Sequence, residues 1–294
     1  GVFPVATKTA ATFKSPLTGN LGESYAGGRL SLALRFAGHE AVVIKGRAER
    51  PSYISINDQE VRIKDATSIW GVDAQTTGII LRDREPGVGR RSIIRIGPAG
   101  EAGVRFACVM VDTYRHFGRL GLGAVFGSKN LKALAVSGTE HVDVPDIKRY
   151  KEVYNRLYKT AVQTEVMEKY HDIGTSVNIS VLNWLRGLPT KNFLLSSFPE
   201  GEKISGEVFA EKHLIRRFSC AGCPIGCVHI AALKTAFSEH HEFEVRRVSY
   251  DYEPIYSLGS NLGVKTAEGI LQLIDACERL GLDVMSAGVV LSWA

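Results

Sequence analysis

Three cysteines at positions 220–227 limit how this chain of 294 residues can fold. Cys220, Cys223 and Cys227 follow a C-x₂-C-x₃-C spacing, with Pro224 after the second cysteine. Because thiolates held this close repel one another, the stretch indicates a bound metal centre, either an iron–sulfur cluster or zinc. Both centres need four ligands. His229 as the fourth would make a zinc site; otherwise the fourth ligand is distant in sequence or outside this chain.

The composition excludes several classes of protein. The chain has only five cysteines and no secretory signal, which disfavours a disulfide framework and favours a cytoplasmic protein. A charged fraction of 23% and an apolar fraction of 45% are typical of a soluble globular protein. No apolar run reaches the length of a membrane helix. The formal charge of +5 is spread along the chain, so a nucleic-acid partner is not indicated.

Short β-rich runs dominate the first half of the chain. Strands are predicted at 41–45, 53–56, 61–64, 91–96, 104–111 and 131–136. The dipeptide Asn57-Asp58 predicts a hairpin turn, and a helix is predicted between Val72 and Arg84, stopped by Pro86-Gly87. Glycine is dense at 19–28 and 118–127, which indicates either tight turns or a backbone that approaches something closely.

Helical periodicity replaces this pattern after Pro145. Ile147, Tyr150, Tyr154 and Leu157 recur three and four residues apart. A second helix is expected from about residue 266, with Gly281 just past its end. We therefore expect an α+β fold with a β-rich domain at 1–142 and a mostly helical domain at 143–294. Cys108 and Cys277 lie on apolar stretches and are interpreted as packing thiols.

Apolar sequence at both ends indicates a fragment. The chain begins without Met, and residues 289–294 are largely apolar where natural termini are usually polar. We expect this end to expose apolar surface and the isolated chain to be inactive and to form oligomers, or to need a partner segment that supplies the rest.

Five motifs taken in order resemble one known family. They are KSPLTG at 14–19, IGPAGE at 96–101, GAVFGSKNLKA at 123–133, CAGCPIGC at 220–227 and LGLD at 280–283. Together they are similar to the aldehyde ferredoxin oxidoreductase family, whose members carry a tungsten bis-pterin cofactor and one [4Fe–4S] cluster. The resemblance covers nearly the whole chain. The family's first segment and its C-terminal third have no counterpart here.

The resemblance implies a β-rich base for the cofactor with mostly helical domains above it. It implies that Cys220, Cys223 and Cys227 ligate a [4Fe–4S] cluster, with the fourth cysteine in the absent C-terminal part. It also implies a tungsten or molybdenum bis-pterin, with Mg²⁺ as a further cofactor at the pterin phosphates. The residues that match cofactor-binding positions are Lys8, Ala26, Gly27, Gly28, Arg115, His116, Arg119, Glu278, Leu282 and Asp283.

Two of these positions depart from the family pattern. Lys8 stands where an arginine is usual, which keeps the charge and loses the bidentate geometry. Glu278 replaces the first aspartate of the family's D-x-x-G-L-D pterin motif. Taken alone, residues 278–283 read as the end of one helix and the start of the next.

Glu253 is the candidate catalytic residue. Aromatic neighbours and the following Pro254 suggest a partly buried, rigid acid, whose pKa burial would raise toward neutrality. Its position matches the family's active-site glutamate, which implies a general base acting on water or a metal-bound hydroxyl. Asp251 is the nearest competitor, and a surface glutamate is the structural alternative. The position of a subunit-bridging iron ligand in some relatives corresponds to Gln272, so that iron is not expected.

The resemblance implies oxidation of a small aldehyde to a carboxylic acid, with electrons passing through a pterin and the cluster to ferredoxin or another electron-transfer protein. A homo-oligomer is expected. Two alternatives stay open at the level of the sequence. One is a family member with other reductive chemistry, such as reduction of an acid or an activated aromatic ring. The other is a non-catalytic zinc or iron–sulfur module, which metal content would distinguish.

Overall fold

The computed structural model describes residues 3–236 and 242–294, and the chain divides into two compact units. The first unit consists of Gly1–Thr160, Cys220–Pro224 and Glu278–Asp283. The second consists of Ala161–Ser219, Ile225–Cys277 and Val284–Ala294. Two short segments from the second half of the sequence are thus integral parts of the first unit. No helix in the described part of the chain is long and apolar enough to cross a membrane.

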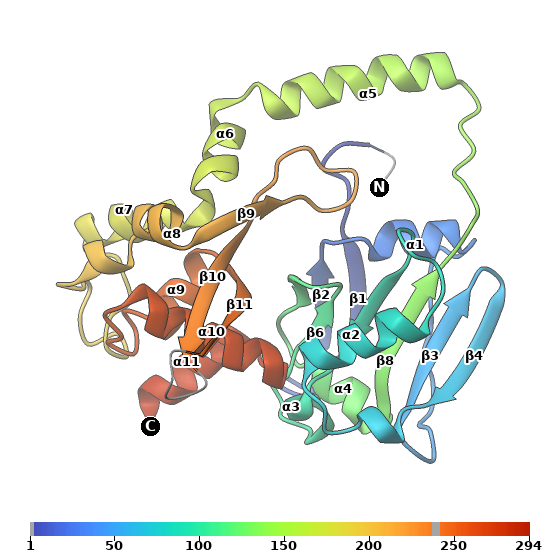
Figure 1. Ribbon diagram of the computed structural model, residues 1–294, viewed down its shortest axis with the longest axis horizontal. Helices are drawn as coiled ribbons and strands as arrows, with labels where there is room; N and C mark the ends of the chain where they lie inside the picture. Colours follow the sequence, from blue (N-terminus) through green and yellow to red (C-terminus); the bar gives the residue numbers. More distant parts are fainter. Residues whose placement is uncertain (1–2, 237–241) are drawn as a thin grey trace. The chain divides into compact units, whose positions relative to one another are not determined.

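A mixed sheet of six strands forms the centre of the first unit, in the order β4-β3-β8-β5-β6-β7 (Figure 1). β3 and β8 run parallel, and the other neighbouring pairs are antiparallel. The strands are β3 (Ser52–Asn57), β4 (Glu60–Asp65), β5 (Ser92–Arg95), β6 (Val109–Val111), β7 (Arg115–Phe117) and β8 (Leu131–Ser137).

Two apolar layers cover the faces of this sheet. Successive side chains of β8 alternate between them, because side chains along a strand point to opposite faces. Leu134 and Val136 pack in one cluster with α1 (Leu30–Phe36) and α4 (Leu122–Ser128). Ala133 and Ala135 pack in the other cluster with the 3₁₀ turn η1 (Thr67–Ile69) and α2 (Ala74–Arg84). β8 is therefore buried on both sides.

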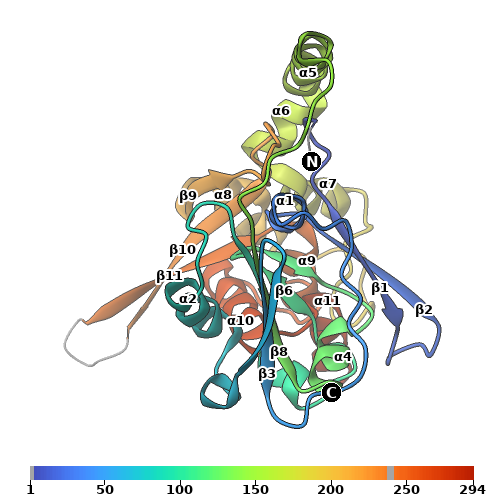
Figure 2. The same ribbon diagram turned by 90° about the vertical axis from the view of Figure 1, so that its right-hand side faces the viewer.

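Three further elements complete the first unit. β1 (Thr9–Lys14) and β2 (Leu21–Ala26) form a separate antiparallel pair, visible in Figure 2. β2 also packs beside β7, which brings the end of β2 next to Arg115 and His116. The short helix α3 (Pro98–Glu101) contacts α4, and α5 (Ile147–Val162) begins in this unit.

The second unit combines helices with a three-stranded antiparallel sheet in the order β11-β10-β9. Its strands are β9 (Leu214–Phe218), β10 (Val228–Ala236) and β11 (Phe243–Tyr250). Its helices and turns are α6 (Glu165–Asp172), η2 (Gly174–Val177), α7 (Asn178–Trp184), η3 (Gly201–Ile204), α8 (Gly206–Lys212), α9 (Tyr252–Leu258), α10 (Ala267–Leu280) and α11 (Val284–Trp293). The last turn of α10 belongs to the first unit.

The predicted α+β fold class is confirmed, with two local differences. The predicted strand at 41–45 is irregular, because Val43 is 77% exposed and the stretch pairs with no strand among the described residues. The predicted strand at 104–111 is reduced to Val109–Val111. The hairpin turn at Asn57-Asp58 and the helix ending before Pro86 are confirmed. Cys108 and Cys277 are buried, as predicted for packing thiols.

A buried carboxylate fixes the end of α2 to the sheet. Glu85 follows α2 and is 5% exposed. It accepts hydrogen bonds from the Tyr53 hydroxyl at 2.8 Å and the Ser55 hydroxyl at 2.6 Å, and it pairs with Lys64 at 2.8 Å. Burial opposes ionisation, but these three hydrogen bonds outweigh it and hold the pKa of Glu85 below its usual value.

Replacing Glu85 by Gln should therefore destabilise the protein in a pH-dependent way. A lowered folded-state pKa contributes stability that is complete above the unfolded-state pKa and is lost as the pH falls through the folded-state value. We expect Glu85→Gln to lower the free energy of unfolding by about 1–3 kcal/mol near pH 7. The difference from wild type should shrink toward about pH 4. Urea unfolding at both pH values measures it.

Glu60→Gln is the matched control. Glu60 is exposed and pairs with the exposed Arg62 on the same strand, so this change should cost little at either pH. A Glu85→Gln protein as stable as wild type at neutral pH would contradict the assigned role of this carboxylate.

Candidate functional site

Most of the predicted cofactor-binding residues come from three segments of the first unit. These segments are the end of β2 with the loop after it, β7 with the loop after it, and the Glu278–Asp283 segment. β2 packs beside β7, and Glu278 lies near His116 of β7. Residues separated by more than two hundred positions in the sequence are therefore neighbours in one unit, as in the Gln75–Glu278 contact.

The loop after β2 has no room for side chains. Gly28 has φ +95°, and a Cβ there would lie 2.8 Å from an Asp112 carboxylate oxygen. That carboxylate accepts a hydrogen bond from the Arg29 N–H at 2.7 Å. A Cβ at Gly27 would lie 2.5 Å from the Sγ of Cys220. Glycine at these positions is thus required by close approach and not by the turn alone.

The cysteine loop packs directly on this glycine loop. The Ala221 N–H donates to the Gly28 carbonyl oxygen at 3.1 Å, and both residues belong to the first unit. Within the cysteine loop, the Cys223 N–H donates to the Cys220 carbonyl at 3.0 Å. The glycine loop, which is predicted to bind the cofactor, and the cysteine loop therefore share a contact although they are far apart in the sequence.

β7 carries Arg115 and His116. Burial, together with the nearby Arg95 and Arg115 guanidinium groups, lowers the pKa of His116 to about 4. The imidazole is therefore neutral at physiological pH. Its Nε2 atom is buried and has no hydrogen-bond partner among residues 3–236 and 242–294. It lies 3.9 Å from a Glu278 carboxylate oxygen, which is neither a hydrogen bond nor an ion pair for a neutral ring.

The Glu278–Asp283 segment is fixed to the first unit by its backbone. The Cys108 N–H donates to the Gly281 carbonyl at 2.9 Å, and the Asp283 N–H donates to the Phe106 carbonyl at 3.0 Å. A Cβ at Gly97 would lie 2.4 Å from the Leu280 carbonyl oxygen. Gly281 has φ +75°, as expected for the residue that ends a helix. The IGPAGE motif thus supplies the glycine against which this segment lies.

Both acids of this segment are buried. Glu278 is 3% exposed and accepts a hydrogen bond from the Gln75 side-chain amide at 3.3 Å. Asp283 is 5% exposed and accepts one from the Arg119 guanidinium at 3.3 Å. Leu282 forms an isolated antiparallel bridge with Ala107. Each carboxylate is therefore held in place by a donor from another element.

Lys8 is the most peripheral of the predicted residues. It is exposed and directly precedes Thr9. Thr9 pairs with Ala26 at the end of the β1–β2 ladder that is farthest from the turn joining the two strands. The register places its backbone beside the glycine loop.

The three cysteines are divided between the two units. Cys220 and Cys223 belong to the first unit and Cys227 to the second. In the part of the chain that the structure describes, no group of three or more His, Cys, Asp or Glu side chains is arranged to hold a metal ion. Gly222 and Gly226 adopt φ +73° and +70°, so both glycines of the motif serve the turn between the cysteines.

His229 does not fit the role of a zinc ligand. It is 1% exposed, and its Nε2 atom lies 2.9 Å from the His171 carbonyl oxygen. Burial lowers the pKa of His229, although hydrogen bonding to the backbone of His171 opposes this. Coordination of zinc through Nε2 would break that contact, and the other ring nitrogen, Nδ1, is packed against Gly174. The residue packs with Tyr250 inside the second unit.

Glu253 lies on the first turn of α9. The sequence suggested a partly buried acid, and this expectation is wrong for the chain described, because Glu253 is exposed. The helix explains the difference. Residues on the inner side of α9, such as Ile255 and Leu258, are buried, whereas Glu253 is on the outer side.

Sequence reasoning missed the residues that hold the site in place. Asp73 caps α2 by accepting hydrogen bonds from the Gln75 and Thr76 N–H groups. Its carboxylate also lies 3.7 Å from the Arg279 guanidinium. The N-cap pattern at Asp73 is readable from the sequence, but contacts with residues two hundred positions away are not.

Nearly the whole chain matches models of one protein family. Residues 1–138 match the model of the aldehyde ferredoxin oxidoreductase N-terminal domain, and residues 150–294 match the model of domains 2 and 3 of the same enzyme. Tungsten-containing aldehyde ferredoxin oxidoreductases of Pyrococcus furiosus and Thermococcus kodakarensis are 38% and 37% identical to this chain over 99% of its length. The chain spans about half of these relatives, 47% of each.

More distant similarity is found in two other proteins. The WOR-like subunit of an aliphatic sulfonate oxidoreductase of Pyrococcus furiosus is 29% identical over the whole chain and 48% of that protein. The active-site complex BamBC of benzoyl coenzyme A reductase has the same fold, with a TM-score of 0.77 at 21% identity over 100% of this chain and 45% of that one. The two family models together account for almost every residue, and the chain belongs to the aldehyde ferredoxin oxidoreductase family.

Proposed function

We propose that the protein to which this chain belongs oxidises aldehydes to carboxylic acids at a tungsten or molybdenum bis-pterin and passes the electrons through a [4Fe–4S] cluster to ferredoxin. The observation that carries the proposal is the contact between Gly27 and Cys220. It brings the predicted pterin loop against a predicted cluster ligand, as electron transfer between two such centres requires. The 37–38% identity to aldehyde oxidoreductases favours aldehydes over the sulfonates of the 29% identical relative.

The chemistry of the site fits a pterin. A flat ring system with amino and ring N–H groups needs hydrogen-bond acceptors and a flat backbone surface from which no side chain projects. Glu278 and Asp283 supply buried carboxylates, and the buried Nε2 atom of neutral His116 lacks a partner in the described residues. Gly27 and Gly28 supply a backbone surface of this kind.

The roles of the other side chains follow from their charge. Arg115, Arg119 and Lys8 would neutralise the pterin phosphates, together with any Mg²⁺ bound there. Ala26 and Leu282 border the loop and the acidic segment without adding polar groups. When bound, the metal–pterin centre would supply the two-electron oxidation. The chain's own residues would bind the cofactor, orient it and exclude water from one side.

The cysteines would hold the cluster. In this proposal Cys220, Cys223 and Cys227 are three of its ligands, and the fourth lies outside this chain. The packing of His229, with Nε2 against the His171 carbonyl and Nδ1 against Gly174, supports a cluster over the zinc alternative. Metal analysis separates the two, because a zinc module would contain zinc without iron, acid-labile sulfide or tungsten.

Glu253 would act as the acid–base residue. The proposal is supported by its position on the first turn of α9, which matches the position of the family's active-site glutamate. Because it is exposed in this chain, the remainder of the protein would have to supply the environment that closes over it. A cytoplasmic location, a homo-oligomer and ferredoxin as electron acceptor complete the proposal.

The contact that carries the proposal can be tested at Gly27. A methyl group at this position would collide with Cys220, so Gly27→Ala should displace a cluster ligand. We expect the iron and acid-labile sulfide content of the anaerobically purified full-length protein to fall severalfold, and the EPR signal of the reduced cluster to fall with it. Cys220→Ser should have the same effect.

Gly187→Ala is the control for the glycine substitution. A Cβ at Gly187 would make only ordinary contacts with Leu182, the nearest at 3.7 Å, so this variant should retain its iron. A Gly27→Ala protein with a full complement of iron and an unchanged EPR signal would show that Cys220 does not ligate a cluster at this position.

The role of Glu253 has its own test. Glu253→Gln keeps the size of the side chain and removes its basicity, so it should leave metal and pterin content unchanged. Loss of a positioned base typically slows a reaction by about 10²–10⁴-fold, and we expect kcat for aldehyde oxidation to fall in that range. Asp251→Asn is the comparison. If it impairs turnover and Glu253→Gln does not, the base is Asp251.

A further inference from the structure

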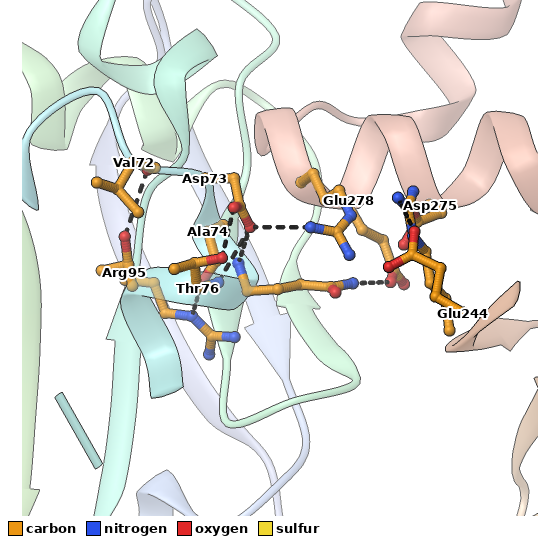
Figure 3. A network of polar contacts seen from close by, with 12 residues as sticks. Val72, Asp73, Ala74, Thr76, Arg95, Glu244, Asp275 and Glu278 are labelled. Atoms are coloured by element: carbon orange, nitrogen blue, oxygen red, sulfur yellow. Dashed lines mark hydrogen bonds and ion pairs between the residues drawn. The ribbon is translucent and has the colours of Figure 1, made fainter. Parts of the chain in front are cut away.

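The start of α2 contacts the Glu278–Asp283 segment at two points. The Gln75 side-chain amide donates to a Glu278 carboxylate oxygen at 3.3 Å. Asp73, the N-cap of the same helix, lies 3.7 Å from the Arg279 guanidinium. Figure 3 shows Asp73, Ala74, Thr76 and Glu278 connected in one network of polar contacts. None of the family-like motifs includes residues 73–76.

Two buried cations bind the backbone carbonyls at the start of α2. Arg95 of β5 is 1% exposed and donates to the Ala74 carbonyl at 2.7 Å. Lys132 of β8 is fully buried and donates to the Val72 carbonyl at 2.7 Å. Lys132 also pairs with Glu101, which accepts a hydrogen bond from the Gly71 N–H at 2.7 Å. Each cation forms charge-assisted bonds in a buried place, so the turn is rigid where it meets Glu278.

A glycine inside α2 makes this arrangement possible. A Cβ at Gly78 would lie 2.8 Å from the Arg95 guanidinium carbon. A glycine within a helix is destabilising relative to alanine, so its presence here accords with the need for space above Arg95. The side chain of Arg95 can then pass close to the helix backbone and reach the Ala74 carbonyl.

The hydrogen bond at Gln75 has a defined direction. An ionised carboxylate can only accept hydrogen bonds, so Gln75 must present its NH₂ group to Glu278. One carboxylate oxygen is thereby occupied by α2, and the other lies on the side of His116, 3.9 Å from its Nε2 atom. The charged and titratable groups around Glu278 include His116 on β7, Arg95 on β5, Asp73 before α2, and Arg279 on its own helix.

We propose that Gln75 is a positioning residue for the cofactor: it orients the Glu278 carboxylate so that one oxygen faces the pterin site. This inference rests on the proposed function, because it names the residue that aligns one of the proposed pterin ligands. Glu278 would touch the pterin, and Gln75 would act only through Glu278.

Two substitutions of Gln75 in the full-length protein test the inference. Gln75→Leu removes the donor, and we expect about three- to tenfold weaker retention of tungsten and pterin after anaerobic dialysis. Gln75→Glu places a carboxylate opposite Glu278. Two such groups share a proton, so the pKa of one is raised. Retention by Gln75→Glu should therefore be poor at pH 8 and should recover toward pH 6, while wild type retains the cofactor at both.

Gln163 provides the matched control, because it is exposed and lies between α5 and α6. Gln163→Leu and Gln163→Glu should behave as wild type at both pH values. Circular dichroism and thermal unfolding establish that all four variants are folded. If Gln75→Glu retains the cofactor as wild type does, or loses it equally at pH 8 and pH 6, the positioning role is wrong.

The two proposals fail in distinguishable ways. A wild-type full-length protein that contains no tungsten, molybdenum or pterin after expression with both metals would overturn the proposed function. The contact itself is then judged in the cofactor-free protein by amide hydrogen exchange at residues 278–283. Faster exchange in Gln75→Leu than in Gln163→Leu would support the role of Gln75 in holding this segment, and equal exchange would overturn it.

Discussion

The structure of the first unit depends on a backbone contact with a segment from far along the sequence. The carbonyl of Gly281 and the N–H of Asp283 bond to the chain at Cys108 and Phe106, where a strand partner would otherwise be missing. Gly97 permits the close approach. Unpaired buried backbone groups are costly, so this contact fixes Glu278 and Asp283 relative to β6 and β7. The candidate site exists only because that segment lies there.

Buried charge is the second constraint on this unit. Lys132, Arg95 and Glu85 are all within the interior, and each is bonded to carbonyl groups or an opposite charge. A buried ion pair contributes little net stability, whereas removing one partner leaves an uncompensated charge and is strongly destabilising. Two of the three hold the start of α2 and the third holds its end. Polar anchoring therefore helps to determine where this helix lies, together with the packing of Leu81 in the apolar cluster.

The sequence predicted the elements whose side chains are buried in a regular pattern. β8, α2 and α10 are of this kind. The resemblance carried by the five motifs is confirmed by the family models. The strands β1, β2, β9, β10 and β11 were not predicted. β1 consists largely of Ala and Thr, and β9 contains two exposed arginines, so neither has a clear strand pattern. The exposure of Glu253 also differed, because aromatic neighbours in sequence say little about which side of a helix a residue occupies. The contacts of Gln75 and Asp73 depend on tertiary packing alone.

The discontinuity of the first unit has a consequence for biosynthesis. Its sheet and most of its helices are complete by Thr160, but its remaining pieces are Cys220–Pro224 and Glu278–Asp283. A ribosome synthesises the chain from the N-terminus. In the nascent first unit, the backbone groups of Cys108 and Phe106 therefore lack these hydrogen-bond partners until residue 283 has emerged from the ribosome. The glycine loop lacks its contact with Ala221 until the cysteine loop has been synthesised, and His116 of β7 lacks Glu278 for longer still. The contact of the Glu278–Asp283 segment with the chain at Cys108 and Phe106 is consequently formed late, after translation of the helix that ends at Leu280.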